Sequence, residues 1–258
     1  MLSNLLEKQR ELDEIYHTEL NKEELKKKFG TKIQKYSAPF LINLEKSYVD
    51  ANVKVMFVGK ETNGWWGKIE DFIKYDDSID MLKKRYEVEL NGGTFLTKEN
   101  KASKERDREH NWDKSKFLLM YKKLRKEFNS LVWSELLKMD SGAKGSSKNS
   151  IGIKEIEEIS IKIFKKELEV LKPDFVIFGT STGQGYDRVI KEIFQDYKTD
   201  EKLYIKHNLW KFKSEKYNCV CYRTRHPNAT NWKYDKPEDK MSIDQYYLKI
   251  IEDIKTKI

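Results

Sequence analysis

Two short segments of the chain combine residue types that could carry out acid–base chemistry. The first, Gly59–Trp66, places a glutamate, Glu61, among glycines directly after an apolar run. Glycine lets the backbone turn sharply or approach a ligand, and a glutamate at such a turn can act as a general base or orient water. The second, Arg223–Trp232, places His226 before a proline, which restricts the backbone of the histidine. Arginines suited to phosphate contacts precede this histidine, and Trp232, suited to stacking on a base or wedging into a duplex, follows it.

Each segment also has an ordinary structural interpretation. Glu61 fits a strand-to-loop turn with a solvated carboxylate, and His226 fits a loop histidine with its hydrogen bonds satisfied. The remaining histidines, His17, His110 and His207, have no comparable neighbours and are interpreted as structural. The first segment lacks the glycine and Lys-Ser/Thr spacing of phosphate-binding loops. Histidines and cysteines do not occur at zinc-site separations, so we expect neither a metal nor another cofactor.

The elements that must position these segments follow from hydrophobic periodicity. Strands are predicted at Val53–Val58, from Leu131 to Trp133, and at Asp174–Phe178, Leu203–Phe212 and Tyr217–Tyr222. Helices are predicted at Leu2–Lys28, in a short stretch ending at Val49, and at Phe117–Phe128, Ile153–Leu171, Gly185–Phe194 and Ser242–Lys257. This alternation predicts an α/β fold with a central, mostly parallel four-stranded sheet flanked by helices. Ligands bind beyond the carboxyl ends of such strands, where both segments begin.

Composition predicts one globular domain over residues 1–258, with an N-terminal helical extension at 1–50, a polar insertion at 76–116 and a flexible loop at Ser141–Ser150. The net charge of +8 favours polyanionic partners such as nucleic acid. The two cysteines, Cys219 and Cys221, are expected on one face of a strand as buried thiols. No signal peptide or membrane-spanning run is visible, so we expect a protein of the reducing cytoplasm without membrane contact. We also expect a monomer.

Taken together, the segments resemble the uracil-DNA glycosylase superfamily. Gly59–Asn63 is similar to the family motif that holds the catalytic water, with Glu61 at the acidic position. His226-Pro227-Asn228 resembles the motif after the last strand, whose histidine stabilises negative charge on the departing base. Trp133–Lys138 resembles the segment that reads the base, and Lys172–Gly179 resembles the third strand.

The departures from the family pattern concern the excised base. Thr62 replaces the usual proline and Asn228 the usual serine, and neither change removes the proposed roles. Glu135 stands where an asparagine reads uracil. An ionised carboxylate only accepts hydrogen bonds, so it suits the amino group of cytosine. Asn63-Gly64 replaces a bulky tyrosine and leaves room for a substituent on C5.

The resemblance implies a monofunctional DNA glycosylase that flips and hydrolytically excises a pyrimidine, a C5-modified cytosine of phage DNA, in antiviral defence. The catalytic residues would be Glu61 and His226. The base-binding residues would be Gly59, Lys60, Asn63, Trp65, Trp66, Phe72, Glu135 and Asn228. DNA, single- or double-stranded, would be bound by Arg223, Arg225, Thr230, Asn231, Trp232, Lys144 and Lys148.

Several alternatives remain open. The chain could excise uracil in repair, or Lys60 could form a Schiff base and nick the strand. It could also be a non-catalytic nucleic-acid binder on the same fold, or an adaptor for a protein partner.

Overall fold

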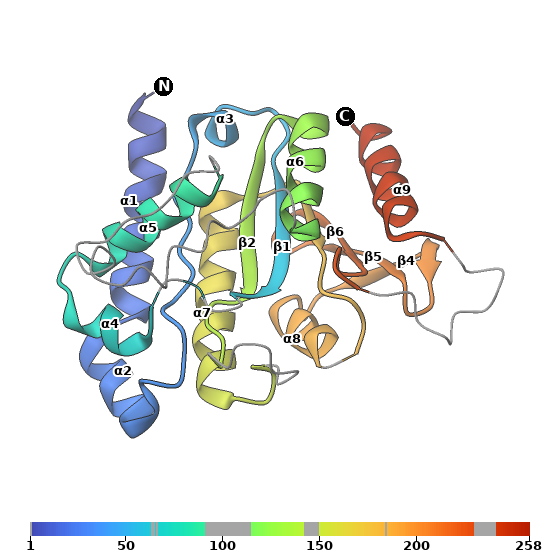
Figure 1. Ribbon diagram of the computed structural model, residues 1–258. Helices are drawn as coiled ribbons and strands as arrows, with labels where there is room; N and C mark the ends of the chain where they lie inside the picture. Colours follow the sequence, from blue (N-terminus) through green and yellow to red (C-terminus); the bar gives the residue numbers. More distant parts are fainter. Residues whose placement is uncertain are drawn as a thin grey trace.

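One mixed sheet forms the centre of the molecule (Figure 1). The computed structural model describes residues 2–62, 65, 67–90, 115–141, 150–183, 185–229 and 241–258. Their strands form a six-stranded sheet in the order β2-β1-β3-β6-β5-β4. The strands are β1 (Val55–Glu61), β2 (Leu131–Leu137), β3 (Phe175–Phe178), β4 (Lys198–Ile205), β5 (Leu209–Ser214) and β6 (Cys219–Thr224).

The α/β class and the parallel centre are as expected, but the sheet has six strands where the sequence predicted four. β1 pairs in parallel with β2 and β3, and β3 pairs in parallel with β6. The remaining strands, β5 and β4, continue the sheet antiparallel beyond β6. The predicted strand Leu203–Phe212 is wrong, because the chain reverses between β4 and β5. His207 adopts the left-handed conformation there, with φ of 67°.

Helices cover both faces of the sheet, which explains why the central strands are largely apolar. On one face, the ring of Phe57 in β1 contacts Phe117 and Tyr247, at centroid distances of 4.6 and 6.0 Å. These rings belong to α6 (Lys116–Phe128) and α9 (Ile243–Lys255). On the other face, Phe178 of β3 contacts Phe164 of α7 (Lys154–Leu171), and α8 (Tyr186–Ile193) packs beside α7. The two helical layers are visible on either side of the sheet in Figure 1.

The N-terminal helices are part of the body. The predicted helix Leu2–Lys28 is divided into α1 (Leu2–Glu19) and α2 (Lys22–Phe29), because Asn21 caps the second helix through its side chain. A 3₁₀ turn at Gly30–Lys32 and α3 (Lys46–Val49) follow. α1 packs along α7, where the Tyr16 hydroxyl donates to Glu167 at 3.0 Å.

The first part of the predicted polar insertion over 76–116 is helical and packs on the rest of the molecule. After α4 (Ile69–Lys74), residues Ser78–Leu90 form α5, whose side chains Leu82 and Tyr86 are buried. The Tyr86 hydroxyl donates to the Trp133 carbonyl at 3.1 Å and accepts from the Trp133 amide at 3.0 Å. Residues 91–114, with the rest of the expected insertion, lie outside the described residues.

Two smaller expectations concern the thiols and the membrane. Cys219 and Cys221 are free and buried, with their sulfurs 3.6 Å apart on β6, as expected for structural thiols on one strand face. In the described part of the chain, no helix has the length and apolar character needed to cross a bilayer.

Candidate active site at the carboxyl ends of the parallel strands

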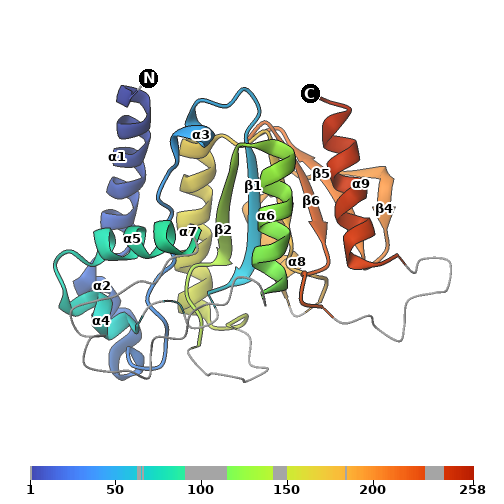
Figure 2. The same ribbon diagram turned by 45° about the horizontal axis from the view of Figure 1, so that its top comes forward.

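The parallel pairing brings the predicted acidic residues to one edge of the sheet. Gly59 of β1 lies opposite Glu135 of β2, and Glu61 lies opposite Leu137. β6 ends at the same edge, so His226 follows it there. Figure 2 shows the arrowheads of β1 and β2 pointing to this edge, away from the chain termini. Sequence patterns that are far apart in the chain therefore meet in space.

Gly59 leaves the space that the Glu135 carboxyl occupies. A Cβ atom placed on Gly59 would lie 2.3 Å from Glu135 Oε2 and 2.5 Å from Oε1, well inside van der Waals contact. The Glu135 side chain is buried, and the indole Nε1 of Trp133 donates to its Oε1 at 2.9 Å. Its pKa is raised well above the usual value, first by burial. A side chain at position 59 would therefore force the Glu135 carboxyl to move.

Glu61 is half-buried and ties the strand end to the start of the next segment. Its Oε2 accepts the backbone N–H of Ser150 at 3.0 Å. Burial raises the pKa of the Glu61 carboxyl, while the hydrogen bonds from Ser150 oppose that shift. A carboxyl with a raised pKa binds a proton more readily than a solvated one, which suits a general base. After burial, the neighbouring Glu61 and Glu135 carboxyls contribute to the raised pKa of Tyr186, which places the Tyr186 phenol near both of them.

His226 is held in one tautomer by its own loop. The backbone N–H of Asn228 donates to Nδ1 at 3.1 Å, so Nδ1 is the acceptor and Nε2 carries the proton of the neutral ring. The His226 amide donates to Ser181 Oγ at 2.7 Å, which fixes the loop to the segment after β3. Burial, followed by the positive charge of Lys60, lowers the pKa of His226 to about 3. The imidazole is therefore a neutral donor at ordinary pH.

Aromatic rings connect the histidine to the carboxyl of Glu135. The His226 ring stacks on Phe117 at a centroid distance of 5.7 Å. Phe117 in turn contacts the Trp133 ring at 5.8 Å, and Trp133 holds Glu135. Phe117 gave no signal in the sequence beyond an apolar position on a helix. Its role in the site depends on which helix covers the sheet at this point.

Lys60 and Thr62 complete the end of β1. The Lys60 ammonium lies over the ring of Tyr186, 5.4 Å from its centroid, and burial lowers the pKa of the lysine. The Thr62 hydroxyl contacts Ser37 Oγ at 2.9 Å and bonds the carboxylate of Asp140. Thr62 thus ties β1 to the segment after β2.

Four of the predicted site residues are placed otherwise than expected. Arg223 is buried and pairs with Asp187 at 3.0 Å, so the prediction that it contacts phosphate is wrong. Arg225 is buried as well, which removes it from the surface that a phosphate would reach. The Trp65 ring packs in the core against Trp133, at a centroid distance of 5.7 Å.

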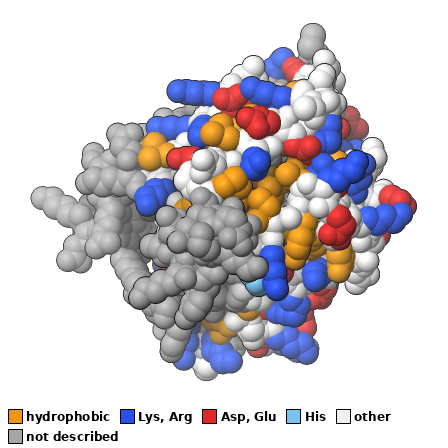
Figure 3. All heavy atoms as spheres, turned by 90° about the vertical axis from the view of Figure 1, so that its right-hand side faces the viewer, with side chains coloured by type: hydrophobic (Ala, Val, Ile, Leu, Met, Phe, Trp, Pro, Cys, Tyr) orange, Lys and Arg blue, Asp and Glu red, His pale blue; other side chains and the backbone are white. Residues whose placement is uncertain are grey.

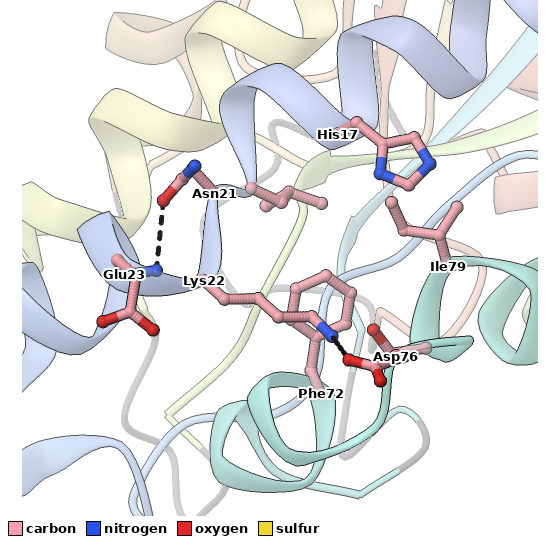
Figure 4. A pocket seen from close by; sticks show the side chains of 9 residues that line it. His17, Asn21, Lys22, Glu23, Phe72, Asp76 and Ile79 are labelled. Atoms are coloured by element: carbon pink, nitrogen blue, oxygen red, sulfur yellow. Dashed lines mark hydrogen bonds and ion pairs between the residues drawn. The ribbon is translucent and has the colours of Figure 1, made fainter.

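Phe72 is the fourth predicted site residue that lies elsewhere than expected. It is fully buried and lines a pocket of about 300 Å³ between the N-terminal helices and α4–α5. Figure 4 shows its ring beneath Lys22, whose ammonium lies 3.8 Å from the Asp76 carboxylate. It cannot stack on a base from there. Asn228, by contrast, is exposed in the His226 loop. Seven further candidates lie outside the described residues: Asn63, Trp66, Thr230, Asn231, Trp232, Lys144 and Lys148.

A larger cavity opens next to the histidine loop. It has a volume of about 570 Å³ and is lined by Pro227 and Ala229, by the first turns of α6 and by the start of α9. The lysines on its wall are Lys116 and Lys123, of which Lys116 is exposed. Sequence reasoning missed them because the chain carries 51 basic residues and neither lies in a motif. On the face of the molecule with α9 and β4, basic and acidic side chains are intermixed around exposed hydrophobic ones (Figure 3).

Among the described residues, no group of three or more His, Cys, Asp and Glu side chains is arranged to hold a metal ion. No protein-family model matches the chain, and no curated protein matches it either.

Proposed function

We propose that the chain is a DNA glycosylase that extrudes a pyrimidine, a cytosine-type base, and hydrolyses its N-glycosidic bond. The observation that carries this proposal is the meeting of Glu61, Glu135 and His226 at one edge of the parallel strands. Two carboxyls with raised pKa values and a neutral imidazole form a set of groups whose protonation is tuned by burial. Such tuning is typical of acid–base catalysis.

The proposal gives each group a step. Glycosidic cleavage develops positive charge on the sugar and negative charge on the base. Ionised Glu61 would stabilise the sugar cation and orient the water that attacks C1′. The Nε2–H of His226 would donate to the carbonyl oxygen of the departing base. Because the ring is already neutral and oriented by Asn228, it needs no reorganisation during the reaction.

The proposal also uses the aromatic rings near the strand ends. Phe117 stacks on His226 and contacts Trp133, so an extruded base would meet an aromatic wall. Stacking on such a wall contributes about 1–3 kcal/mol per base, which offsets the few kcal/mol that unstacking costs. With Arg223 and Arg225 buried, we assign the phosphate contacts to Lys116 and Lys123 at the cavity beside Pro227.

The test is base release from defined duplexes by the purified protein. Duplexes carrying uracil, 5-hydroxymethylcytosine or its glucosylated form are incubated in single-turnover excess of enzyme, and alkali-labile abasic sites are measured. We expect excision of a cytosine-type base, and a loss of about 10²-fold or more in rate for Glu61→Gln because the water loses its base. Glu155→Gln, a change at an acidic residue of the first turn of α7, is the matched control. Release of uracil alone would favour the repair alternative, and no release from any strand would overturn the proposal.

Borohydride reduction in the same assay distinguishes the lyase alternative. A Schiff base on Lys60 would be trapped as a covalent protein–DNA adduct, and Lys60→Arg would abolish it. The lowered pKa of Lys60 makes the amine a better nucleophile than a solvated lysine. The water mechanism predicts abasic sites without an adduct.

A further inference from the structure

One oxygen of the Glu135 carboxyl is hydrogen-bonded, and the other is buried without a hydrogen-bond partner among the described residues. Oε1 accepts the indole N–H of Trp133 at 2.9 Å. Oε2 is buried and has no hydrogen-bond partner within the described parts of the chain. Buried polar atoms are nearly always paired, so an open one at a candidate site points to a ligand. The side chain as a whole is only 4% exposed.

The groups that face this carboxyl favour its neutral form. The carboxylates of Glu61, on β1, and Asp140, after β2, both disfavour a negative charge on it. The positive charge of Lys138 favours the ionised form of the Glu135 carboxyl. The Lys138 ammonium, however, is 2.6 Å from Glu167 Oε2 and also donates to Ser134 Oγ. From α8, Tyr186 contributes a neutral phenol whose own pKa is raised. Burial disfavours a carboxylate whose neighbouring cation is shared with another acid, so these surroundings favour a proton on the carboxyl.

The hydrogen bond from Trp133 determines which oxygen carries that proton. Oε1 is the acceptor in that bond, so the hydroxyl is at Oε2. Glu135 thus presents an O–H donor from Oε2 beside the acceptor Oε1. The Watson–Crick edge of cytosine offers the complementary pair, an unprotonated N3 beside the N4 amino group. An ionised carboxylate could only accept and would face the N3 lone pair with its own.

We propose that Glu135 is the general acid of the reaction, and that its Oε2 proton passes to ring N3 of an extruded cytosine-type base as the glycosidic bond breaks. This inference rests on the proposed function. The C1′–N1 bond breaks with its electron pair on the base, and the proton on N3 makes the base leave as a neutral tautomer. Water adds to C1′ and gives a proton to Glu61. Transfer of that proton through solvent to Glu135 restores both carboxyls.

This role makes Glu135 a specificity-determining residue. N3 of uracil and thymine already carries a proton and cannot accept another, so Glu135 would give these bases no acid catalysis. They would depend on His226 alone. The selectivity for cytosine-type bases then arises in the rate of bond cleavage as well as in binding.

Two substrates and one substitution test the chemical step. Single-turnover excision is measured for a duplex with the preferred cytosine-type base and for the same duplex with its 3-deaza analogue, in which N3 is replaced by C–H. For the normal base we expect Glu135→Gln to slow excision by about 10²-fold or more, since general acid catalysis contributes that much. For the analogue we expect wild type and Glu135→Gln to be equally slow. Equal slowing of both substrates by Glu135→Gln would reduce Glu135 to a positioning group and overturn the inference.

A second measurement needs no activity. The infrared difference spectrum between wild type and Glu135→Gln at neutral pH should contain the carbonyl stretch of a neutral carboxylic acid. Carboxylate bands in its place would overturn the inference alone, whatever the protein excises. A neutral carboxyl together with no excision from any duplex would instead overturn the proposed function, and the catalytic part of the inference with it.

Discussion

At the residue scale, the neutral state of His226 depends on two separable causes. Burial is the larger, and the charge of Lys60 is the second. The unfolded histidine titrates near its ordinary pKa of 6.5 and the folded one near 3. The unfolded chain therefore binds a proton that the folded chain does not as the pH falls through this window, and His226 destabilises the fold progressively from about pH 6.5 down to about pH 3.

Replacing Lys60 with methionine should raise the pKa of His226. The substitution removes the positive charge that disfavours the imidazolium and leaves the burial of the ring in place. Histidine ring resonances followed by NMR during a pH titration measure the shift. Lys172→Met is the matched control, because Lys172 precedes β3 at the opposite edge of the sheet. An unchanged His226 titration in the Lys60 variant would contradict the proximity of the two side chains.

Gly59 and Glu135 should be coupled in stability. A methyl group on Gly59 would collide with the Glu135 carboxyl, so Gly59→Ala should lower the free energy of unfolding by about 1–3 kcal/mol. In a Glu135→Ala background the same substitution should cost much less, because the colliding atoms are gone. Urea unfolding of the four proteins of this double-mutant cycle measures the coupling. Additive effects would show that the carboxyl does not lie over the glycine.

At the scale of elements, one buried network joins α1, β2 and α7. The Lys138 ammonium and the Glu167 carboxylate are both fully buried, and Tyr16 and Ser134 donate to the same carboxylate. The network fixes the end of β2, just beyond Glu135. Through Tyr16 it also joins the N-terminal helix α1 to the core of the molecule.

Removing one charge of the Lys138–Glu167 ion pair should strongly lower the free energy of unfolding. Glu167→Gln leaves the Lys138 charge buried without its counter-ion, so we expect a loss of about 3–5 kcal/mol in the free energy of unfolding. Glu169→Gln, at an exposed position of the same helix, should change it by less than about 0.5 kcal/mol. Thermal and urea unfolding provide the comparison. The double variant Lys138→Met, Glu167→Leu should recover much of the loss, since neither charge remains.

The elements also show what sequence patterns can and cannot predict. Strand ends rich in glycine and polar residues were visible locally, so Glu61 and His226 could be chosen as candidates from the residues themselves, whereas Glu135, inside β2, was a candidate only through the resemblance of its segment to a family motif. Arg223 was misassigned because its partner, Asp187, belongs to a different element, and only the fold brings the two together. Phe72 was misassigned for a related reason. An apolar residue near a site motif packs wherever its helix turns, and α4 turns toward the N-terminal helices.

At the scale of the whole molecule, the excess positive charge bears on DNA binding. A net charge of +8 is spread over a surface that also carries many acidic groups, so local placement matters more than the total. The exposed Lys116 at the cavity beside Pro227 is the described lysine best placed for a phosphate.

Lys116→Gln should weaken DNA binding and reduce its dependence on salt. Each phosphate contact contributes a slope of about −0.9 in log affinity against log salt for duplex DNA, so we expect the slope to fall by about one unit. Fluorescence anisotropy at several salt concentrations measures it. Lys172→Gln, at the opposite edge, should leave both affinity and slope unchanged. Binding that is absent or insensitive to salt would favour the adaptor alternative.

The two hydrogen bonds between the Tyr86 hydroxyl and the backbone of Trp133 also bear on aggregation of the protein. Among the described strands β2 is the outermost on its side of the sheet, and the tyrosine hydroxyl occupies one amide and one carbonyl that a foreign strand would need. β4, the edge strand on the other side among the described strands, carries lysines and an irregularity in its pairing. Both features hinder pairing with a foreign strand. Within the described residues, both outer strands therefore carry features that hinder growth of the sheet. We expect concentrated solutions to resist fibril formation, and Tyr86→Phe to weaken that resistance.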